Sequence, residues 1–257
     1  KQMFSNRFVK LILGFLILIA GLDSLFNIYS NRKDIVGKFS NKVNPKYNKN
    51  YSKEDEYWAK KIIEGGYILF FRHAEREKWI DVKMYDALES DLHKNGVNGT
   101  RYAENDYFSL AVCLNSRGLV QAKAMKEVID YSKLPVGRII SSPSCRSRQT
   151  AEIVFGRYDS LDRNLVHSGP YNEDRKIKQN YLKNFLLNTP VQKGLNTVIS
   201  AHNGVMDNTI LSVGGDKLSL EEGGFYVISN NNNRLELKHE FHNFNDFSRV
   251  FFIRNFD

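Results

Sequence analysis

The chain has 257 residues, of which 42% are hydrophobic and 26% charged, the composition of an ordinary globular protein with room for one sizeable domain and appendages or two small domains. Its net charge is +8, but residues 1–55 hold +6 of it and the remaining 202 residues only +2. The positive charge therefore gives no ground for a nucleic-acid ligand of the main domain, and we predict none.

An apolar segment near the N-terminus predicts a membrane anchor. Residues 9–29 contain an uninterrupted apolar run from Leu11 to Leu22, and three basic residues come before it. Counted as a whole, the segment reaches the ~20 residues that a membrane-spanning helix needs. We interpret 9–29 as a signal anchor; a cleaved signal peptide and a buried core helix are the alternatives.

Residues 30–53 are polar, rich in Asn and Lys, and without periodicity, which is typical of a tether between membrane and domain. The basic start of the chain favours export of the residues after the anchor. The lysines of the tether favour the opposite orientation, because positive loops tend to stay in the cytoplasm. These two indications conflict, so charge alone leaves the orientation open.

The domain, residues 54–257, opens with a helix and a strand. Residues 54–64 have the apolar spacing of an amphipathic helix, which Gly65 and Gly66 would end. Residues 67–71, "YILFF", form a candidate strand buried on both faces. Residues 80–110 are polar and irregular, and we interpret them as a long excursion.

A second helix and a second strand follow the excursion. Asn115 or Ser116 is placed to cap a helix over 117–133, in which apolar residues recur at helical spacing. Residues 136–140 form the next candidate strand, and a further helix begins after Pro143. The chain thus alternates helix-like and strand-like segments.

The last part of the chain contains another strand and a hairpin. Residues 197–201 form the third candidate strand, and residues 223–229 and 234–241 flank four Asn residues as a hairpin with a polar turn. The alternation predicts an α/β fold, a three-layer sandwich of a mainly parallel sheet with helices on both faces.

Three of these strands end in loops that carry His73, Arg146 and His202, each followed by a helix start. Ligands bind at the carboxyl ends of strands in open α/β sheets, and helix N-termini there offer N–H groups to anions. Arg72 and Arg76 flank His73. The sequence therefore predicts that two His and three Arg meet at one edge of the sheet as an anion site.

An imidazole between two guanidinium groups is suited to attack on phosphorus. Arginine binds phosphate oxygens through two parallel hydrogen bonds. Attack by a neutral histidine divides hydrolysis into two displacements through a phosphohistidine, and the leaving oxygen needs a proton donor. Taken alone, one Arg-His pair is also compatible with a surface charge cluster.

Four stretches, taken together, resemble the histidine phosphatase superfamily, which includes the cofactor-dependent phosphoglycerate mutases. They are "RHAER", "LNSRGLVQAKAM", "SSPSCRSRQTAE" and "ISAHNG". The superfamily pattern is Arg-His-Gly-x-Arg after the first strand, a helix start Leu-Thr-x-x-Gly-x-x-Gln-Ala, Ser-Ser-Pro-x-x-Arg-Ala after the second strand, and a lone His after a later one. The motifs come in the order of the superfamily and cover roughly residues 62–230.

The resemblance implies a phosphoglycerate mutase-like fold and a role for each matching residue. His73 would be the nucleophile, and Glu173, in the loop "GPYNED", would be the proton donor. The phosphate would lie among four side chains: Arg72, Arg76, Arg146 and His202. The resemblance further implies phosphatase activity without a metal or another cofactor.

The sequence departs from the superfamily pattern at three places. Ala74 replaces a Gly and Ser147 an Ala, both small changes, and His202 is followed by Asn203. The chain therefore lacks the His-Asp acid of the phytase and acid-phosphatase branch. Besides Glu173, the carboxylates of Asp174 and Glu75 are candidates for the acid.

The anchor together with "LFFRHAER" and "HN" also resembles the bacterial lipopolysaccharide core heptose phosphatases. This implies a phosphorylated small molecule or glycan as substrate, and a domain that faces the periplasm from the inner membrane. A phosphoglycerate mutase-type phosphoryl transferase and an inactive protein that binds a phosphorylated ligand are the alternatives.

The cysteines exclude a zinc site of the nucleobase deaminase type. The stretch from His73 to Glu75 fits the His-x-Glu of zinc nucleobase deaminases, but Pro-Cys-x-x-Cys is missing, since Arg148 stands where the second Cys belongs. Cys113 and Cys145, 32 residues apart, are the only two cysteines, so this zinc site cannot be built. The other histidines have no ligand spacing that converges with His73, and we therefore predict no metal. We expect two separately buried thiols; one bridge between them is the alternative.

Overall fold

The computed structural model describes residues 52–78, 112–166, 175–203, 206, 220–231 and 234–252. The chain divides into two units, residues 1–50 and 51–257, and all described residues belong to the second. The predicted anchor, 9–29, lies outside them, as does nearly all of the predicted tether. No helix in the described ranges is long and apolar enough to cross a membrane.

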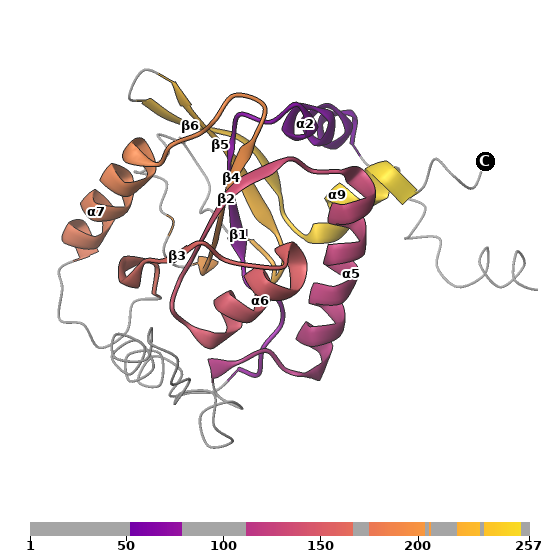
Figure 1. Ribbon diagram of the computed structural model, residues 1–257, viewed down its shortest axis with the longest axis horizontal. Helices are drawn as coiled ribbons and strands as arrows, with labels where there is room; N and C mark the ends of the chain where they lie inside the picture. The colour runs from indigo at the N-terminus through magenta and orange to yellow at the C-terminus, as the bar shows by residue number, and fades with distance from the viewer. Residues whose placement is uncertain are drawn as a thin grey trace, which may run out of the picture. The chain divides into compact units, whose positions relative to one another are not determined.

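A mixed six-stranded sheet, counted over the described ranges, forms the centre of the domain (Figure 1). Its order is β3-β2-β4-β1-β5-β6, with parallel pairing from β3 to β1 and antiparallel pairing from β1 to β6. The strands are β1 (Ile68–Arg72), β2 (Val136–Ser141), β3 (Ser160–Leu161), β4 (Asn196–Ala201), β5 (Phe225–Asn231) and β6 (Arg234–Phe241).

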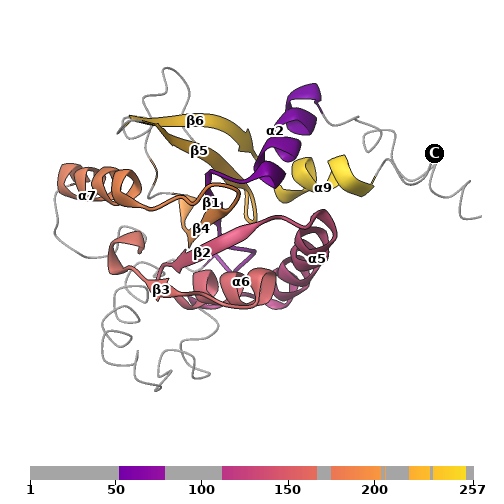
Figure 2. The same ribbon diagram turned by 45° about the horizontal axis from the view of Figure 1, so that its top comes forward.

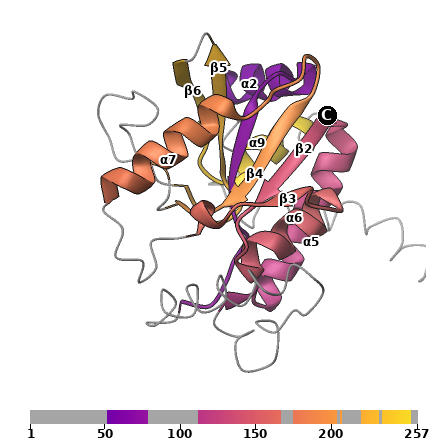
Figure 3. The same cartoon turned by 60° about the vertical axis from the view of Figure 1, so that its left-hand side comes forward.

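Helices cover both faces of this sheet. They are α2 (Lys53–Glu64), α5 (Ser116–Ser132), α6 (Cys145–Phe155), α7 (Arg175–Asn188) and α9 (Phe244–Phe252), with a short 3₁₀ turn, η2 (Arg163–Leu165). Figures 2 and 3 show α7 on one side of the sheet and α5 and α6 on the other. The predicted fold class, an α/β sandwich of three layers with a mainly parallel sheet, is confirmed.

Strand β1 separates two hydrophobic cores because its side chains alternate between the faces. Leu69 and Phe71 pack into the core shared by α2, α5, α6 and α9, whereas Ile68 and Phe70 pack into the core beneath α7. β1 is paired on both edges, to β4 and β5, and its four apolar residues are fully buried. A strand fixed in this way is a rigid support for the residues that follow it.

The first helix begins slightly earlier than predicted. Ser52 caps α2: its hydroxyl accepts from the N–H of Asp55, whose carboxylate in turn accepts from the N–H of Ser52. The helix ends at Glu64 before Gly65, which has a φ of 76° and no room for a Cβ atom against the backbone of Gly194. The capped start of this helix thus includes Ser52 and Lys53, two residues of the predicted tether.

Candidate active site

The chain segments leaving β1, β2 and β4 stay paired beyond the ends of the strands. The N–H of His73 donates to the carbonyl of Ala201 at 3.0 Å, and the N–H of Ser142 donates to the carbonyl of Ser200 at 2.9 Å. These bonds fix the backbone of His73 beside that of His202, and their rings lie 5.2 Å apart between centroids. The carboxyl edge of the sheet is thus where the predicted histidines meet.

His73 is held in one tautomer. Its side chain is buried, with 3% of the residue exposed, and Nδ1 lies 2.7 Å from the carbonyl oxygen of Ala74. Because a carbonyl only accepts, Nδ1 carries the proton and the lone pair resides on Nε2. Burial, the dominant cause, and the positive charges of Arg146, Arg72 and Arg76 lower the pKa of His73 well below 6.5. The ring is therefore neutral near pH 7, as a nucleophile must be.

Arg146 reaches the site from the first turn of α6. It is 1% exposed, and its Nη2 donates to Nδ1 of His202 at 3.2 Å. Since a guanidinium only donates, Nδ1 of His202 accepts, and the proton of that ring is on Nε2, 3.1 Å from the hydroxyl of Ser142. A buried guanidinium against the second histidine offers a fixed positive charge at this edge of the sheet.

Arg72 and Arg76 come from the end of β1 and the loop after it. Arg72 donates from Nη1 to the carbonyl of Leu220 at 2.5 Å and lies 3.3 Å from Glu222 through Nη2. Arg76 donates to the carbonyl of Glu77 at 2.5 Å. Both lower the pKa of His73, which means that both charges act on the imidazole.

The start of α5 clamps the loop after His73. A Cβ atom on Gly118 would lie 1.9 Å from the carbonyl oxygen of Glu75, so only glycine permits this approach. Gln121 accepts from the N–H of Glu75 at 2.8 Å and donates from its Nε2 to the carbonyl of Glu222 at 2.7 Å. The Gly and Gln of the helix motif therefore join the His73 loop to the turn before β5; the sequence motif alone assigns Gln121 no role.

The carboxylate of Glu75 is tied to the same helix. It pairs with Arg117 and accepts from Nδ2 of Asn115, the N-cap of α5, at 3.2 Å. These contacts turn Glu75 toward α5 and give it a structural use. The prediction that Asn115 or Ser116 caps this helix is resolved in favour of Asn115, which accepts from the N–H of Gly118 at 2.7 Å.

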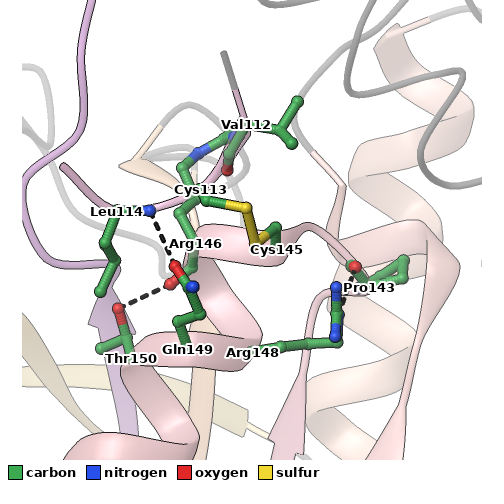
Figure 4. The surroundings of a disulfide bond; sticks show 9 residues. All are labelled: Val112, Cys113, Leu114, Pro143, Cys145, Arg146, Arg148, Gln149 and Thr150. Carbon is green, nitrogen blue, oxygen red and sulfur yellow. Dashed lines mark hydrogen bonds between the residues drawn. A yellow bond between two sulfur atoms is a disulfide. The ribbon is translucent and has the colours of Figure 1, made fainter. Parts of the chain in front are cut away.

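The two cysteines form a disulfide, so the expectation of separate thiols was wrong (Figure 4). Cys145 is the first residue of α6, and the fold brings its Cα to 4.8 Å from that of Cys113. A separation of 32 residues in sequence does not reveal such a meeting, because it depends on how the fold places residues 112–114 beside the start of α6. Closing a loop of this length stabilises the fold by about 3–4 kcal/mol.

Hydrogen bonds join the same two segments as the disulfide, residues 112–114 and the start of α6 (Figure 4). The N–H of Leu114 donates to Gln149 at 2.8 Å, and Nη1 of Arg146 reaches the carbonyl of Val112 at 3.4 Å. Thr150 donates to the carbonyl of Arg146 and accepts from the N–H of Ala74. Residues 112–114 thereby hold the N-terminal end of α6, which carries Arg146, in place.

The predicted proton donor, Glu173, lies outside the described residues, as does its neighbour Asp174. The structure thus brings together five of the six predicted site residues: Arg72, His73, Arg76, Arg146 and His202. The roles of these residues in binding and catalysis stay predictions. In the described ranges, no three His, Cys, Asp or Glu side chains are grouped so that they could hold a metal ion.

No protein-family model and no curated protein matches the chain. Solved structures do match it, each covering 68% of the chain. They include the protein histidine phosphatase SixA complexed with tungstate (14% identity, TM-score 0.43, 96% of that chain covered) and phosphoglycerate mutase from Thermus thermophilus (17%, 0.42, 98%). A third is a mutant of phosphoserine phosphatase from Entamoeba histolytica in complex with phosphoserine (12%, 0.44, 96%). These structural neighbours are members of the histidine phosphatase superfamily, the one that the four motifs resemble.

Proposed function

We propose that the chain hydrolyses a phosphomonoester through a phosphohistidine on His73, without a metal. The observation that carries this proposal is the state of His73: buried, neutral, with its lone pair on Nε2 and three arginine charges acting on it. A neutral imidazole is the form that attacks phosphorus. Fixed guanidinium groups supply the charge that a phosphoryl group in transfer needs.

The reaction would proceed in two displacements. In the first, Nε2 of His73 forms a bond to phosphorus as the ester oxygen leaves, and Nδ1 keeps its proton through the carbonyl of Ala74. In the second, water attacks the phosphohistidine and Nε2 leaves. Arg72, Arg76 and Arg146 would stabilise the charge of the equatorial oxygens in both steps.

Trapping of the intermediate tests this proposal. The full-length chain in detergent, mixed with a ³²P-labelled phosphomonoester and quenched rapidly, is expected to retain label that survives alkali and is lost in acid, since a phosphoramidate has that stability. Sugar phosphates, lipopolysaccharide core, nucleotides and phosphopeptides form the substrate panel. An acid-stable adduct, or free phosphate released with no adduct at any quench time, would contradict the mechanism.

We also propose that residues 9–29 anchor the chain in the inner membrane and that the domain faces the periplasm. The disulfide between Cys113 and Cys145 supports this orientation, because disulfides persist in oxidising compartments such as the periplasm and are rare in the cytosol. The substrate would then be a phosphorylated small molecule or glycan of the cell envelope.

Alkylation of the two cysteines in intact membranes tests the orientation. Membranes prepared with thiols blocked at lysis and then denatured are expected to yield a chain that a maleimide reagent modifies only after reduction. The matched control is Cys113→Ser, in which Cys145 reacts without reduction. Two reactive thiols in the unreduced wild-type chain would place the domain in the cytosol.

A further inference from the structure

Besides Glu75, a further carboxylate lies near the predicted active-site residues: Glu222, in the turn before β5. Glu222 is followed by Gly223, whose N–H donates to the carbonyl of His73 at 3.1 Å and to that of Arg72 at 3.2 Å. Gln121 holds the carbonyl of Glu222 itself at 2.7 Å. The turn that carries Glu222 is therefore bonded to the backbone of the predicted nucleophile and, through α5, to its loop.

The side chain of Glu222 is turned toward the arginines. Its Oε1 lies 3.3 Å from Nη2 of Arg72, and 16% of the side chain is exposed. Burial, the largest cause, raises the pKa of Glu222, and the charge of Glu75 adds to this rise. The charges of Arg72, Arg76 and Lys78 lower the pKa. Arg72 and Arg76 thus act on this carboxyl group as well as on His73. Their charges favour the ionised carboxylate, whereas burial favours the protonated form.

Binding of a phosphate is expected to favour the protonated form of Glu222. A phosphomonoester brings up to two negative charges, and its oxygens would take the hydrogen bonds of Arg72. Glu222 would then lose its favourable partner and face a like charge in a largely buried place. Both changes favour the protonated carboxyl group, so the substrate itself would load Glu222 with a proton.

We propose that Glu222 is the proton donor to the leaving oxygen; this inference rests on the proposed phosphatase function. As Nε2 of His73 bonds to phosphorus, the bond from phosphorus to the ester oxygen breaks, and the proton of Glu222 passes to that oxygen to give the alcohol. In the second step water bonds to phosphorus, Nε2 leaves, and the Glu222 carboxylate takes the proton of that water. Acid and base are thereby restored in one cycle.

Nearby carboxylates fit this role less well. Glu75 is bound by Arg117 and Asn115. Glu221 is 63% exposed at its side chain and lies 3.8 Å from His242. Glu221 is therefore a matched control: the same side chain, one residue earlier, outside the predicted machinery.

The test compares leaving groups. With Glu222→Gln, kcat/KM for p-nitrophenyl phosphate is expected to stay within about 3-fold of the wild type, because nitrophenolate leaves without a proton. For phenyl phosphate and an alkyl phosphate, kcat/KM is expected to fall by about 10²–10⁴-fold, the usual contribution of general acid catalysis. kcat/KM is the right quantity because it reports formation of the phosphoenzyme, before water enters. Glu221→Gln is expected to match the wild type with every substrate.

Three results would overturn the proposal. An equal loss of kcat/KM with all leaving groups would make Glu222 a positioning residue for Arg72, and no loss would remove it from the reaction. A selective loss in Glu173→Gln, assayed in parallel, would assign the proton to that residue instead. If the wild-type chain hydrolysed none of the esters, the phosphatase function itself would fail, a result distinct from these three.

Discussion

Replacing His73 with alanine is expected to lower kcat at least about 10⁴-fold and to abolish the ³²P adduct, since no other group supplies the Nε2 lone pair. Affinity for inorganic phosphate is expected to change only a few-fold, because the arginines that would bind it remain. Steady-state kinetics with p-nitrophenyl phosphate and calorimetric titration with phosphate measure the two effects. Loss of turnover with retained binding of phosphate is the result expected for a nucleophile and not for a residue that only binds the phosphate.

The control for this substitution is His242→Ala. His242 is 49% exposed at its side chain and pairs with Glu240, so its loss should leave turnover unchanged. Thermal unfolding checks that the His73 variant is folded. Partial recovery of its activity by added imidazole would support direct attack by the ring, whereas undiminished hydrolysis in the variant would refute the phosphohistidine mechanism.

Arg146→Ala is expected to lower kcat/KM by about 10³-fold, or about 4 kcal/mol, by analogy with the loss of a fixed donor at other charged transition states. The buried guanidinium supplies charge to the phosphoryl oxygens and the donor that orients His202 through Nδ1. Arg146→Lys should recover only part of the loss, because an ammonium group cannot form the two parallel hydrogen bonds of the guanidinium. The kinetics are measured with p-nitrophenyl phosphate.

Arg148 is the matched control for a buried arginine on the same helix. It is 2% exposed and donates from Nε to the carbonyl of Pro143 at 2.9 Å, so it holds the loop before α6. Arg148→Lys is expected to lower the melting temperature and leave kcat/KM near that of the wild type. If both arginine-to-lysine variants lost activity equally, Arg146 would have no special part in binding the phosphate.

Five of the six described strands, all except the two-residue β3, and the meeting point of the site are predictable from the sequence because they depend on local patterns. Buried strands are short apolar runs, and β1 is such a run with charged residues at its end. In the parallel part of a sheet the carboxyl ends of the strands lie at one edge, so the order of the strands predicts that His73 and His202 lie close together. The antiparallel hairpin of β5 and β6 is recognisable from its polar turn.

Long-range meetings were not predictable in the same way. The disulfide depends on the placement of residue 113 beside the start of α6. The position of the Glu222 carboxylate depends on the entry into β5, 150 residues after Arg72. Neither contact leaves a repeating pattern along the chain.

The sequence analysis also does not predict the helices α7 and α9. α7 has a weakly apolar face, and α9 is a nine-residue run in which aromatic residues carry the burial, with Phe247 against Phe225 and Phe241.

The disulfide has a consequence for how the protein can change during evolution. It ties Cys113 to Cys145, the residue before Arg146. The hydrogen bonds between residues 112–114 and α6 can therefore change by substitution while the covalent bond still holds the N-terminal end of that helix. Selection can thus act on the non-covalent contacts of this segment while Arg146 keeps its position, because the bond that fixes the start of α6 does not depend on them.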